Sequence, residues 1–477
     1  MITTYEEYLE SLRRMQPNVY LKGEKIGRDH PAILPAIKKI GLTYELTKDP
    51  HWQDMLTAKS HLTGEKINRY CHIYQSVDDM MAIHRCTREF TWLSGGCIQR
   101  CGGRDTLNAL SVTTYNVDQD RGTDYHKRFN AYLEYFQKND CVAPIGITDV
   151  KGQRNLRPHE QADPDMYLRV VKKTKDGIIV RGAKNPIGSA PIAHELVIAP
   201  TRALTKEEGD WAVAFAVPAD AKGVIHVAKS GIAWWPRQHL KAPYAEYGRT
   251  ESFIIFDDVF VPWERVFLCG ETEWGSEVGR LTALYHRWLY SACKPATSDL
   301  LVGAIALLAE YSGIDKASHI REKIADLIAI GELIYGAGIA AAYQSSKSPS
   351  GTMIPNEVFT NVARHHAGVN TYHEFEMLAD VAGALGITLP YEQDFVNETT
   401  GPLLKKYIMR RPDVPVEKIH RLFRYVQDLL GGPQSSVALV GGIHGGGSPI
   451  MEKIALLRLG QIDKKKGIVK RLAGIED

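Results

Sequence analysis

The hydrophobic period of the chain changes twice along its length, and these changes constrain the fold more than any single motif. Up to about Asp140 the apolar residues recur at three- and four-residue spacing, as in Tyr5 to Met15, which predicts helices. From Cys141 to about Val266 the period shortens to that of strands, and after Glu271 the helical period returns and continues to the end. The sequence therefore predicts regions in the order α, β, α.

The middle region contains a hairpin signal followed by several short strand signals. Tyr167 to Val171 and Ile178 to Val180 flank Lys175-Asp176-Gly177, and an Asp-Gly pair between apolar runs favours a tight turn. Each later segment is β-branched or aromatic and bounded by Pro, Gly or Asp; they are HELVIAP, WAVAFAV, GVIHVA and ESFIIFDDVFVP. We expect a compact β-domain here.

Long helical runs dominate the last region. Val278 to Ser312 and His319 to Tyr343 keep the helical period throughout. The longest apolar stretch, Leu327 to Tyr343, is interrupted by Glu332 and is short for a bilayer span, so a buried helix is the better interpretation. Its many small residues would let another helix approach closely, within the subunit or across an oligomer interface.

Length, charge and cysteine content exclude several classes of protein. A chain of 477 residues predicts roughly two to four domains. Its 58 basic and 56 acidic side chains leave a net charge of +2. A charge this small gives no indication of a surface that binds nucleic acid or an anionic membrane. The N-terminus has neither a signal-peptide core nor transit-peptide character, so we expect a cytoplasmic protein. Seven cysteines, an odd number, favour metal ligation or burial over disulfides.

Two pairs of residues have the character of metal ligands. Cys97 and Cys101 are four residues apart and are flanked by glycines. On a helix, two residues at this spacing lie on nearly the same face, about 6 Å apart along the axis. His286 and Cys293 are seven apart, which is two helical turns, and Tyr290 lies one turn from His286 on the same face. Taken alone, either pair is more typical of ordinary burial than of metal ligation.

Together the pairs supply three thiolates and one imidazole. That set suits an iron–sulfur cubane or a Cys3His zinc site, and spacing alone does not separate the two metals. A third segment, Gly441 to Pro449, is dense in glycine and exposes backbone N–H groups at close range, as a phosphate or a flavin requires. On composition alone it is equally an ordinary turn between helices.

These motifs, in this order, resemble the 4-hydroxybutyryl-CoA dehydratase family, flavin and iron–sulfur enzymes related to the 4-hydroxyphenylacetate 3-monooxygenases. The similarity looks full-length and includes YLESLRRMQPNVYLKGEKI, KSHLTGEKINRY, TTYNVDQDRGTDYHKRF, ITDVKGQRNLRP, GIIVRGAK, FIIFDDVFVPWERVFLC, YHRWLYSACK and HGGGSP. The monooxygenase relatives share the scaffold but lack the complete C-x3-C plus H-x6-C set. The intact set favours the dehydratase branch.

The resemblance implies an α+β fold like that of the acyl-CoA dehydrogenases. Residues 1–140 would form an N-terminal α-helical domain, 141–271 a middle β-domain, and 272–477 a C-terminal helical bundle at the core of a homotetramer. It also implies FAD between the β-domain and the bundle, and a [4Fe-4S] cluster. The substrate would be a small acyl-CoA-type molecule, with no nucleic-acid or membrane partner.

Carried over residue by residue, the resemblance implies a set of site residues. The cluster ligands would be Cys97, Cys101, His286 and Cys293. The flavin contacts would be Thr148, Asp149, Arg154, Lys184, Ser189, His444, Gly445, Gly446 and Ser448. The catalytic residues would be His286, Tyr290, Glu251, Lys294 and Gln99. Without the resemblance, Glu251 reads as a solvated strand-edge charge and Gln99 and Lys294 as residues around the ligands or at the surface.

The implied chemistry explains why such a site is needed. Removing water from a 4-hydroxyacyl thioester requires breaking a C–H bond at C3 that the carbonyl does not acidify, so a plain acid–base pair is insufficient. In the implied route a base removes the C2 proton, the flavin accepts one electron, and C3 of the resulting radical becomes acidic. An imidazole ligand is released more easily than a thiolate, so His286 would free its iron for the substrate hydroxyl and act as the base. Tyr290 would assist the leaving hydroxyl.

Two positions depart from the family pattern. The family has a glutamate three residues before the histidine of the HGAGSP-like motif, where this chain has Gly441, and a threonine near the flavin, where it has Gly188 followed by Ser189. Preserved ligands with a lost acid suggest either a dehydratase of 4-hydroxybutyryl-CoA that uses another acid, with vinylacetyl-CoA isomerase activity as a second function, or a related enzyme that acts on a different hydroxyacyl or allylic substrate. The rival interpretation is a reduced-flavin aromatic monooxygenase in which the four ligand-type residues are inert.

Overall fold

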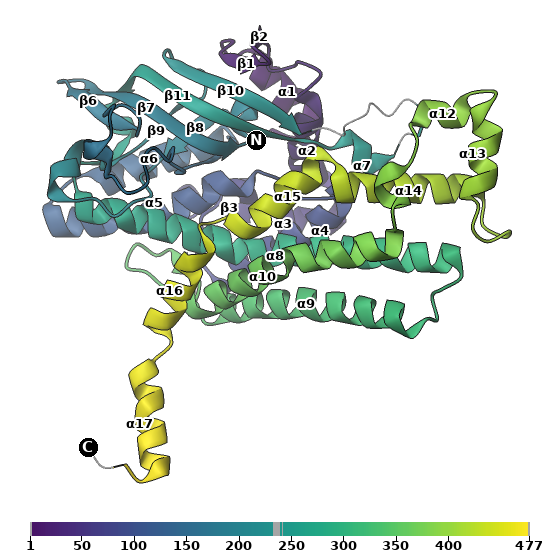
Figure 1. Cartoon of the computed structure of the whole chain (residues 1–477). Helices are drawn as coiled ribbons and strands as arrows, with labels where there is room; N and C mark the ends of the chain where they lie inside the picture. The colour runs from purple at the N-terminus through teal and green to yellow at the C-terminus, as the bar shows by residue number, and fades with distance from the viewer. Residues whose placement is uncertain (1, 232–238, 241, 476–477) are drawn as a thin grey trace.

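The protein is described by a computed structural model, which places residues 2–231, 239–240 and 242–475. Two β-sheets with their covering helices lie above a layer of long helices, and the C-terminal helices extend away from the body as an arm (Figure 1). Helical, strand-rich and helical segments follow one another as expected, and the mixed α and β composition with a helical C-terminal region is confirmed.

The first region is helical but also contributes strands. Its helices are α1 (Tyr5–Arg13), α2 (Leu34–Glu45), α3 (Pro50–Leu56), α4 (Val77–Ser94), α5 (Cys101–Arg121) and α6 (Tyr125–Lys138). Its strands are β1 (Val19–Leu21), β2 (Glu24–Ile26), β3 (Thr57–Lys59) and β4 (Lys66–Asn68). Thr4 begins α1 with a capping box, in which its hydroxyl accepts from the Glu7 backbone and the Glu7 carboxylate reaches back.

The middle region forms two sheets. Its strands are β5 (Ile145–Gly146), β6 (Arg169–Lys173), β7 (Gly177–Gly188), β8 (Glu195–Ile198), β9 (Val213–Pro218), β10 (Val224–Gly231), β11 (Arg249–Pro262) and β12 (Val266–Cys269), with a short α7 (Pro243–Glu246). The six-stranded sheet has the order β2-β1-β10-β11-β7-β6 and the four-stranded sheet the order β12-β9-β8-β5. The predicted hairpin is confirmed, because β6 and β7 pair antiparallel.

The two sheets face each other across one apolar core. Phe215 on β9 meets Phe256 on β11 edge to face, with ring centroids 5.9 Å apart. The same core includes Tyr8 and Leu12 of α1 and Ile37 of α2. The packing therefore crosses the expected boundary at residue 140: apolar side chains of α1 and α2 are buried in the core of the sheets, and β1 pairs with β10.

The last region is built around one long helix. Its helices are α8 (Thr272–Ser312), α9 (Ser318–Tyr343), α10 (Glu357–Ala382), α11 (Leu385–Thr388), α12 (Glu392–Val396), α13 (Thr400–Ile408), α14 (Val416–Gly431), α15 (Pro433–His444), α16 (Pro449–Leu459) and α17 (Ile462–Ala473), with a hairpin of β13 (Ser346–Lys347) and β14 (Met353–Ile354). Helix α8 packs against α4, α5, α9 and α10, so it joins the first region to the last. That central place lets it supply side chains to a site between regions.

Helices α8 and α9 are long and apolar enough to cross a membrane by length and composition alone. In α8, 56% of the apolar window is buried inside the protein, so its composition is that of a core helix. In α9 the buried share is 33%, and Leu333 and Tyr343 are exposed. The predicted burial of Leu327 to Tyr343 thus holds for one face of α9 only, since its buried residues, among them Leu327, Ile334 and Ala341, recur at helical spacing.

Candidate active site between α4, α5, α8 and the glycine-rich segment

The Cys97 segment is a loop, which corrects the expectation that both cysteines share a helical face. Helix α4 ends at Ser94 because Gly95 adopts a left-handed conformation (φ 71°), and Gln99 also has a positive φ of 59°. Cys97 therefore lies between helices, and Cys101 is the first residue of α5.

The loop nevertheless brings the two sulfurs together. The Cys101 thiol donates to Cys97 and lowers the pKa of Cys97 to about 5, and Arg249 and His286 act in the same direction against the effect of burial. Cys97 is thus held as a thiolate near neutral pH, the form in which cysteine binds metal. Cys101 lies at the N-terminus of α5, whose dipole favours negative charge there.

Helix α8 supplies the other two expected ligands. Single ligand atoms of Cys101, Asp105 and His286 all lie within 4.8 Å of one another. Cys293 is half-buried and interacts electrostatically with Cys97; desolvation, followed by Cys97, raises the pKa of the Cys293 thiol. The four residues predicted as cluster ligands are therefore gathered in one region of the structure, from two helices and a loop.

Asp105 is a site residue that sequence reasoning missed. Its carboxylate lies 2.9 Å from Nδ1 of His286 and is completely buried, whereas 23% of the His286 side chain is exposed. Asp105 is four residues after Cys101 on α5, so it faces the same side as the thiol. That spacing was the available signal, but carboxylates at such spacing are common on helices.

Gln99 and Glu251 meet beside the cysteines. The Gln99 amide donates to a Glu251 carboxylate oxygen and to the Thr250 carbonyl, both at 3.1 Å, and its own oxygen accepts from Thr250 N–H at 3.2 Å. Arg249 donates to the same Glu251 oxygen at 2.7 Å. Glu251 is therefore a paired charge at the mouth of the site, and the expectation of a merely solvated strand-edge charge is wrong.

The departure at Gly188 has a local explanation. A Cβ at Gly188 would lie 2.8 Å from the Gln99 amide nitrogen and 3.1 Å from a Glu251 oxygen. The Gln99–Glu251 pair occupies the space that a larger side chain would need. Next to it, the buried hydroxyls of Ser189 and Thr250 have no hydrogen-bond partner within the described part of the chain. Such unpartnered hydroxyls fit a polar ligand at this edge of β7 and β11.

Lys294 is buried against a carboxylate rather than facing an open site. Its ammonium lies 2.5 Å from Glu374 on α10 and 3.2 Å from Ser298 one turn later on α8. Burial lowers the pKa of Lys294, while Glu374 raises it. Tyr290 lies within electrostatic reach of Glu374, Cys293 and Cys97, and its burial raises the pKa of the phenol.

Two buried arginines hold the glycine-rich segment against α8. Arg364 of α10 donates to the carbonyls of Gly442 and Gly445, both at 2.7 Å, and its guanidinium lies 4.7 Å from the centre of the Tyr290 ring. Arg287 of α8 donates to the Gly446 carbonyl at 2.7 Å. These donors satisfy carbonyls at the C-terminus of α15, which have no partner within the helix.

Gly446 and Gly441 differ in the space around them. A Cβ at Gly446 would lie 2.9 Å from Arg287 and 3.6 Å from the His286 ring, and its φ of 81° favours glycine. The segment thus passes directly over His286. Around Gly441, by contrast, a Cβ would meet nothing within 4 Å, so the position where the family has a glutamate is open.

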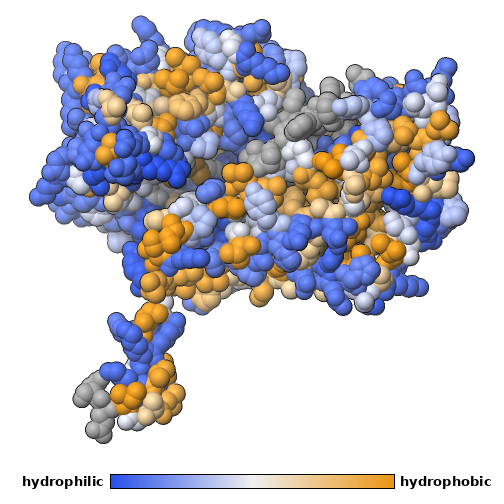
Figure 2. Space-filling view, in the orientation of Figure 1, coloured by the Kyte–Doolittle hydropathy of each residue, from blue (hydrophilic) through white to orange (hydrophobic). Residues whose placement is uncertain are grey.

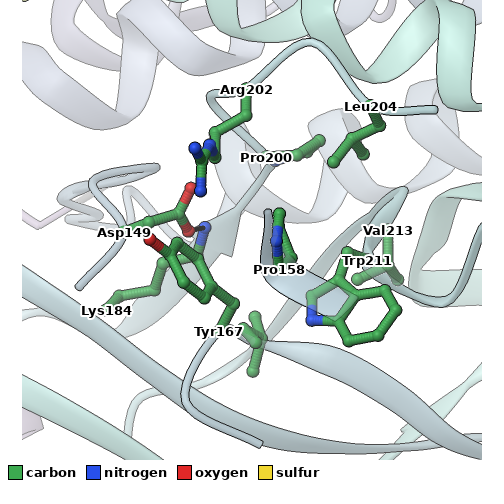
Figure 3. A pocket seen from close by; sticks show the side chains of 10 residues that line it. Asp149, Pro158, Tyr167, Lys184, Pro200, Arg202, Leu204, Trp211 and Val213 are labelled. Atoms are coloured by element: carbon green, nitrogen blue, oxygen red, sulfur yellow. Dashed lines mark hydrogen bonds and ion pairs between the residues drawn. The ribbon is translucent and has the colours of Figure 1, made fainter. Parts of the chain in front are cut away.

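The remaining predicted flavin residues lie at two places. Asp149 and Lys184 line a pocket of the β-domain, together with Tyr167, Arg202 and Trp211 (Figure 3). The Lys184 ammonium contacts Asp149 at 2.5 Å and also donates to the carbonyls of Ile147 and Ala199. The enclosed space, about 10 Å³, suits roughly one water molecule, so the pocket holds no flavin ring in this conformation.

Thr148, Arg154, His444 and Ser448 are less tightly enclosed. The Thr148 carbonyl accepts from Asn185 N–H at 2.9 Å, which joins the loop to β7, and the Arg154 side chain is exposed. His444 is exposed at the C-terminus of α15, and Ser448 precedes α16. His444 to Ser448 lie with His286, whereas Asp149 and Lys184 lie in the β-domain pocket, so the predicted flavin set divides between two places.

Comparison with known proteins identifies the family. The description "4-hydroxyphenylacetate 3-hydroxylase N terminal" matches residues 4–268, and "4-hydroxyphenylacetate 3-hydroxylase C terminal" matches residues 277–474. The chain is 36% identical over 490 residues to the 4-hydroxybutyryl-CoA dehydratase/vinylacetyl-CoA-Delta-isomerase of Clostridium aminobutyricum, with both chains covered completely. It is 29% identical over 438 residues to the 4-hydroxyphenylacetate 3-monooxygenase oxygenase component of Thermus thermophilus, covering 90% of this chain and 88% of that one.

Solved structures give the same result. An oxygen-tolerant archaeal 4-hydroxybutyryl-CoA dehydratase from N. maritimus superposes with a TM-score of 0.94 at 37% identity, covering 100% of this chain and 96% of the other. The oxygenase component of 4-hydroxyphenylacetate 3-monooxygenase complexed with FAD gives 0.85 at 26% identity, covering 98% of each chain. These matches confirm the expected family and enzyme class, a lyase with isomerase activity, and they support a flavoprotein.

Proposed function

The chain belongs to the 4-hydroxyphenylacetate 3-hydroxylase family and is a homologue of 4-hydroxybutyryl-CoA dehydratase, and we propose that it removes water from 4-hydroxybutyryl-CoA or a closely similar hydroxyacyl thioester. The product would be crotonyl-CoA, with vinylacetyl-CoA isomerisation as a second activity. The observation that carries this proposal is the meeting of Cys97, Cys101, His286 and Cys293 beside Glu251 and the glycine-rich segment.

The donor set fits a [4Fe-4S] cluster. Three sulfurs and one imidazole nitrogen are the ligand count that a cubane needs, and Cys97 is already favoured as a thiolate. The unequal donors matter, because the imidazole is the one that a substrate oxygen would displace. When bound, the cluster would supply Lewis-acid activation of the substrate hydroxyl.

FAD fits between β7, β11 and the C-terminal bundle. The unpartnered hydroxyls of Ser189 and Thr250 on the β-domain side, and the contact of Gly446 with Arg287 and His286 on the bundle side, support this placement. We assign the flavin contacts to Ser189 and to His444, Gly445, Gly446 and Ser448, with Thr148, Asp149, Arg154 and Lys184 shaping the β-domain side. When bound, the flavin would supply one-electron transfer to and from the acyl group.

The chain's own residues would handle the protons. His286 Nε2 would accept the proton from carbon, and the contact of Nδ1 with Asp105 supports this role. The phenol of Tyr290, one turn along α8, is kept protonated by burial and would donate to the departing hydroxyl. Glu251, paired with Arg249 and Gln99, would orient the acyl end of the substrate at the mouth of the site.

Lys294 and Gln99 would act on neighbouring groups. Gln99 holds Glu251 in place, and Lys294 brings a buried positive charge next to Cys293, compensated by Glu374. Both roles agree with positions that shape the site rather than contact the reacting carbon.

The exposed apolar surface of the C-terminal helices supports an assembly of several subunits. Helices α16 and α17 extend from the body, no residue of α17 is buried, and apolar side chains are exposed along both; they include Ile450, Ile454, Leu457, Val469 and Leu472 (Figure 2). An arm of this kind is stable when it lies on another subunit. We propose a cytoplasmic homotetramer of subunits with helical, β and helical domains divided near residues 140 and 271, in which α1, α2 and β1 of the first domain pack onto the β-domain.

Anaerobic purification followed by two assays tests the function. We expect stoichiometric FAD, iron and acid-labile sulfide, together with crotonyl-CoA formation from 4-hydroxybutyryl-CoA and from vinylacetyl-CoA. Flavin without iron or sulfide, combined with hydroxylation of a phenol by reduced flavin and oxygen, would instead identify a monooxygenase. Iron and flavin with no turnover of either thioester would reject the substrate assignment alone.

A further inference from the structure

We infer that Asp105 is a positioning residue that determines which ring nitrogen of His286 is free to act as ligand and base. The inference rests on the proposed function, because it concerns the same imidazole. Asp105 belongs neither to the predicted ligand set nor to the glycine-rich segment.

The contact itself selects the tautomer. The Asp105 carboxylate lies 2.9 Å from His286 Nδ1, and an ionised carboxylate only accepts hydrogen bonds. Nδ1 must therefore carry the proton, which leaves the lone pair of a neutral ring on Nε2. The Asp105 carboxylate is fully buried, whereas 23% of the His286 side chain is exposed. Only the histidine of the pair is therefore accessible from the site.

The charge on Asp105 is supported by the next residue of the helix. Arg104 is also fully buried, and its guanidinium lies 3.8 Å from the second Asp105 oxygen. It stacks near the rings of Tyr70 and Tyr74, at 5.4 and 5.3 Å. A buried carboxylate needs such a partner, because an isolated charge inside a protein is strongly destabilising.

Two glycines hold the first turn of α5 in place. A Cβ at Gly102 would lie 2.5 Å from Ile145, and one at Gly103 would lie 2.6 Å from the Ala143 carbonyl. Gly103 N–H also donates to the Ala143 carbonyl at 3.0 Å. The helix can approach the 143–145 segment this closely only with glycine at both positions. The stretch from Cys101 to Asp105 is thus one rigid unit carrying a thiol and a carboxylate one turn apart.

The contact with Asp105 suits a histidine that would serve both as a ligand and as a base. A bound cluster would be held by Nε2, and the Nδ1 contact with Asp105 would keep the ring in place whether or not Nε2 is engaged. When Nε2 then accepts a proton from carbon, the C–H electron pair stays on the substrate and the ring becomes positively charged. Asp105 lies where it stabilises that charge, as a carboxylate does behind a catalytic histidine.

The test uses Asp105→Asn and Asp105→Ala in the full-length, anaerobically purified protein. The control is Ser111→Ala, a buried residue of the same helix that contacts Thr352 and lies outside the site. Iron and sulfide content, iron release to a chelator, electron paramagnetic resonance and thermal unfolding are measured beside kcat and KM.

For Asp105→Ala we expect iron release to be faster by roughly 10- to 100-fold, with the signal of a [3Fe-4S] cluster appearing as the His286-bound iron is lost. Asp105→Asn keeps an acceptor for Nδ1–H but no charge, so it should retain its iron while kcat falls at least about tenfold with KM little changed. Ser111→Ala should match the wild type in iron content and kcat.

Wild-type iron retention in Asp105→Ala, or wild-type kcat in Asp105→Asn, would overturn the inference. If Asp105→Ala does not fold, the Asn variant decides the question through its kcat at unchanged iron content. Absence of iron from the wild-type protein is a different result, because it rejects the proposed function itself.

Discussion

Lys294 Nζ lies 2.5 Å from Glu374, and both side chains are buried, in a contact that joins the helix carrying Cys293 to α10. The Ser298 hydroxyl donates to the same carboxylate oxygen at 2.7 Å. A residue expected in catalysis is therefore engaged by the protein's own carboxylate. Its charge acts on the site through its neighbours.

Removing the carboxylate should destabilise the protein. Glu374→Ala leaves the Lys294 ammonium buried without a counter-charge, so we expect the free energy of unfolding to fall by about 3–5 kcal/mol. Chemical denaturation checks this. The matched control is Glu376→Ala on the same helix, where the side chain is 77% exposed and a change within about 0.5 kcal/mol is expected. Equal effects of the two variants would contradict the assignment.

Adding a methyl group at Gly188 should impair activity more than stability. The new Cβ would displace the flexible Gln99 amide from Glu251, and we expect kcat/KM to fall by between about 10- and 100-fold. Gly441→Ala is the control: its Cβ points into open space on helix α15, where alanine is the better helix former by up to about 1 kcal/mol. Steady-state kinetics and thermal unfolding separate the two effects, and unchanged kinetics in Gly188→Ala would refute the prediction.

Replacing any one of the clustered cysteines should lower the iron content. Cys97→Ser, Cys101→Ser and Cys293→Ser each remove a sulfur that a cluster needs, and we expect loss of iron, sulfide and visible absorption. Cys269→Ser, at the end of β12, should keep the cluster, since that thiol belongs to the β-domain core. Colorimetric iron and sulfide assays decide it, and a full iron complement in the first three variants would falsify the ligand set.

Three histidines outside the site should make the protein less stable in mild acid. Burial lowers the pKa of His84, His194 and His226 to about 3. The unfolded chain binds these protons below pH ~6.5 but the folded chain does not, so stability is full above that pH and declines toward pH 3. Each histidine contributes about 1.4 kcal/mol per pH unit in this window.

Urea denaturation between pH 7.5 and 5 measures this slope. In His84→Gln, which removes one of the three titrating groups, we expect the slope to be shallower by about 1.4 kcal/mol per pH unit. A slope identical to that of the wild type would show that His84 is protonated in the folded protein.

Removing the arm should change the assembly but not the subunit fold. Because no residue of α17 is buried, truncation after Gln461 should leave the far-ultraviolet spectrum and the unfolding transition of the subunit nearly unchanged. Light scattering should show a smaller oligomer than the full-length tetramer. An unchanged tetramer would place the subunit contacts elsewhere.

The alternation of helical and strand periods was predictable because apolar spacing is a local property. The β6–β7 hairpin and the helices α8 and α9 lie close to where the sequence predicts them. The end of α4 was not predicted. Gly95 ends the helix in a left-handed conformation that packs its backbone against the Tyr244 ring, and the local sequence does not show that contact. The packing of α1 with the sheets was missed too, since an amphipathic helix does not specify its partner.

The sequence by itself determined which chemical groups and which pattern of elements the protein has. These are three thiols and an imidazole at helical spacings, a glycine-dense segment, and a hydrophobic period that changes from helix to strand and back. The tertiary structure decided what those groups do. It alone placed Asp105 behind His286, Glu374 on Lys294 and Gln99 on Glu251, because these contacts join residues far apart in the chain. The physical reason is that burial and charge compensation depend on packing between elements, and no local pattern encodes which elements will meet.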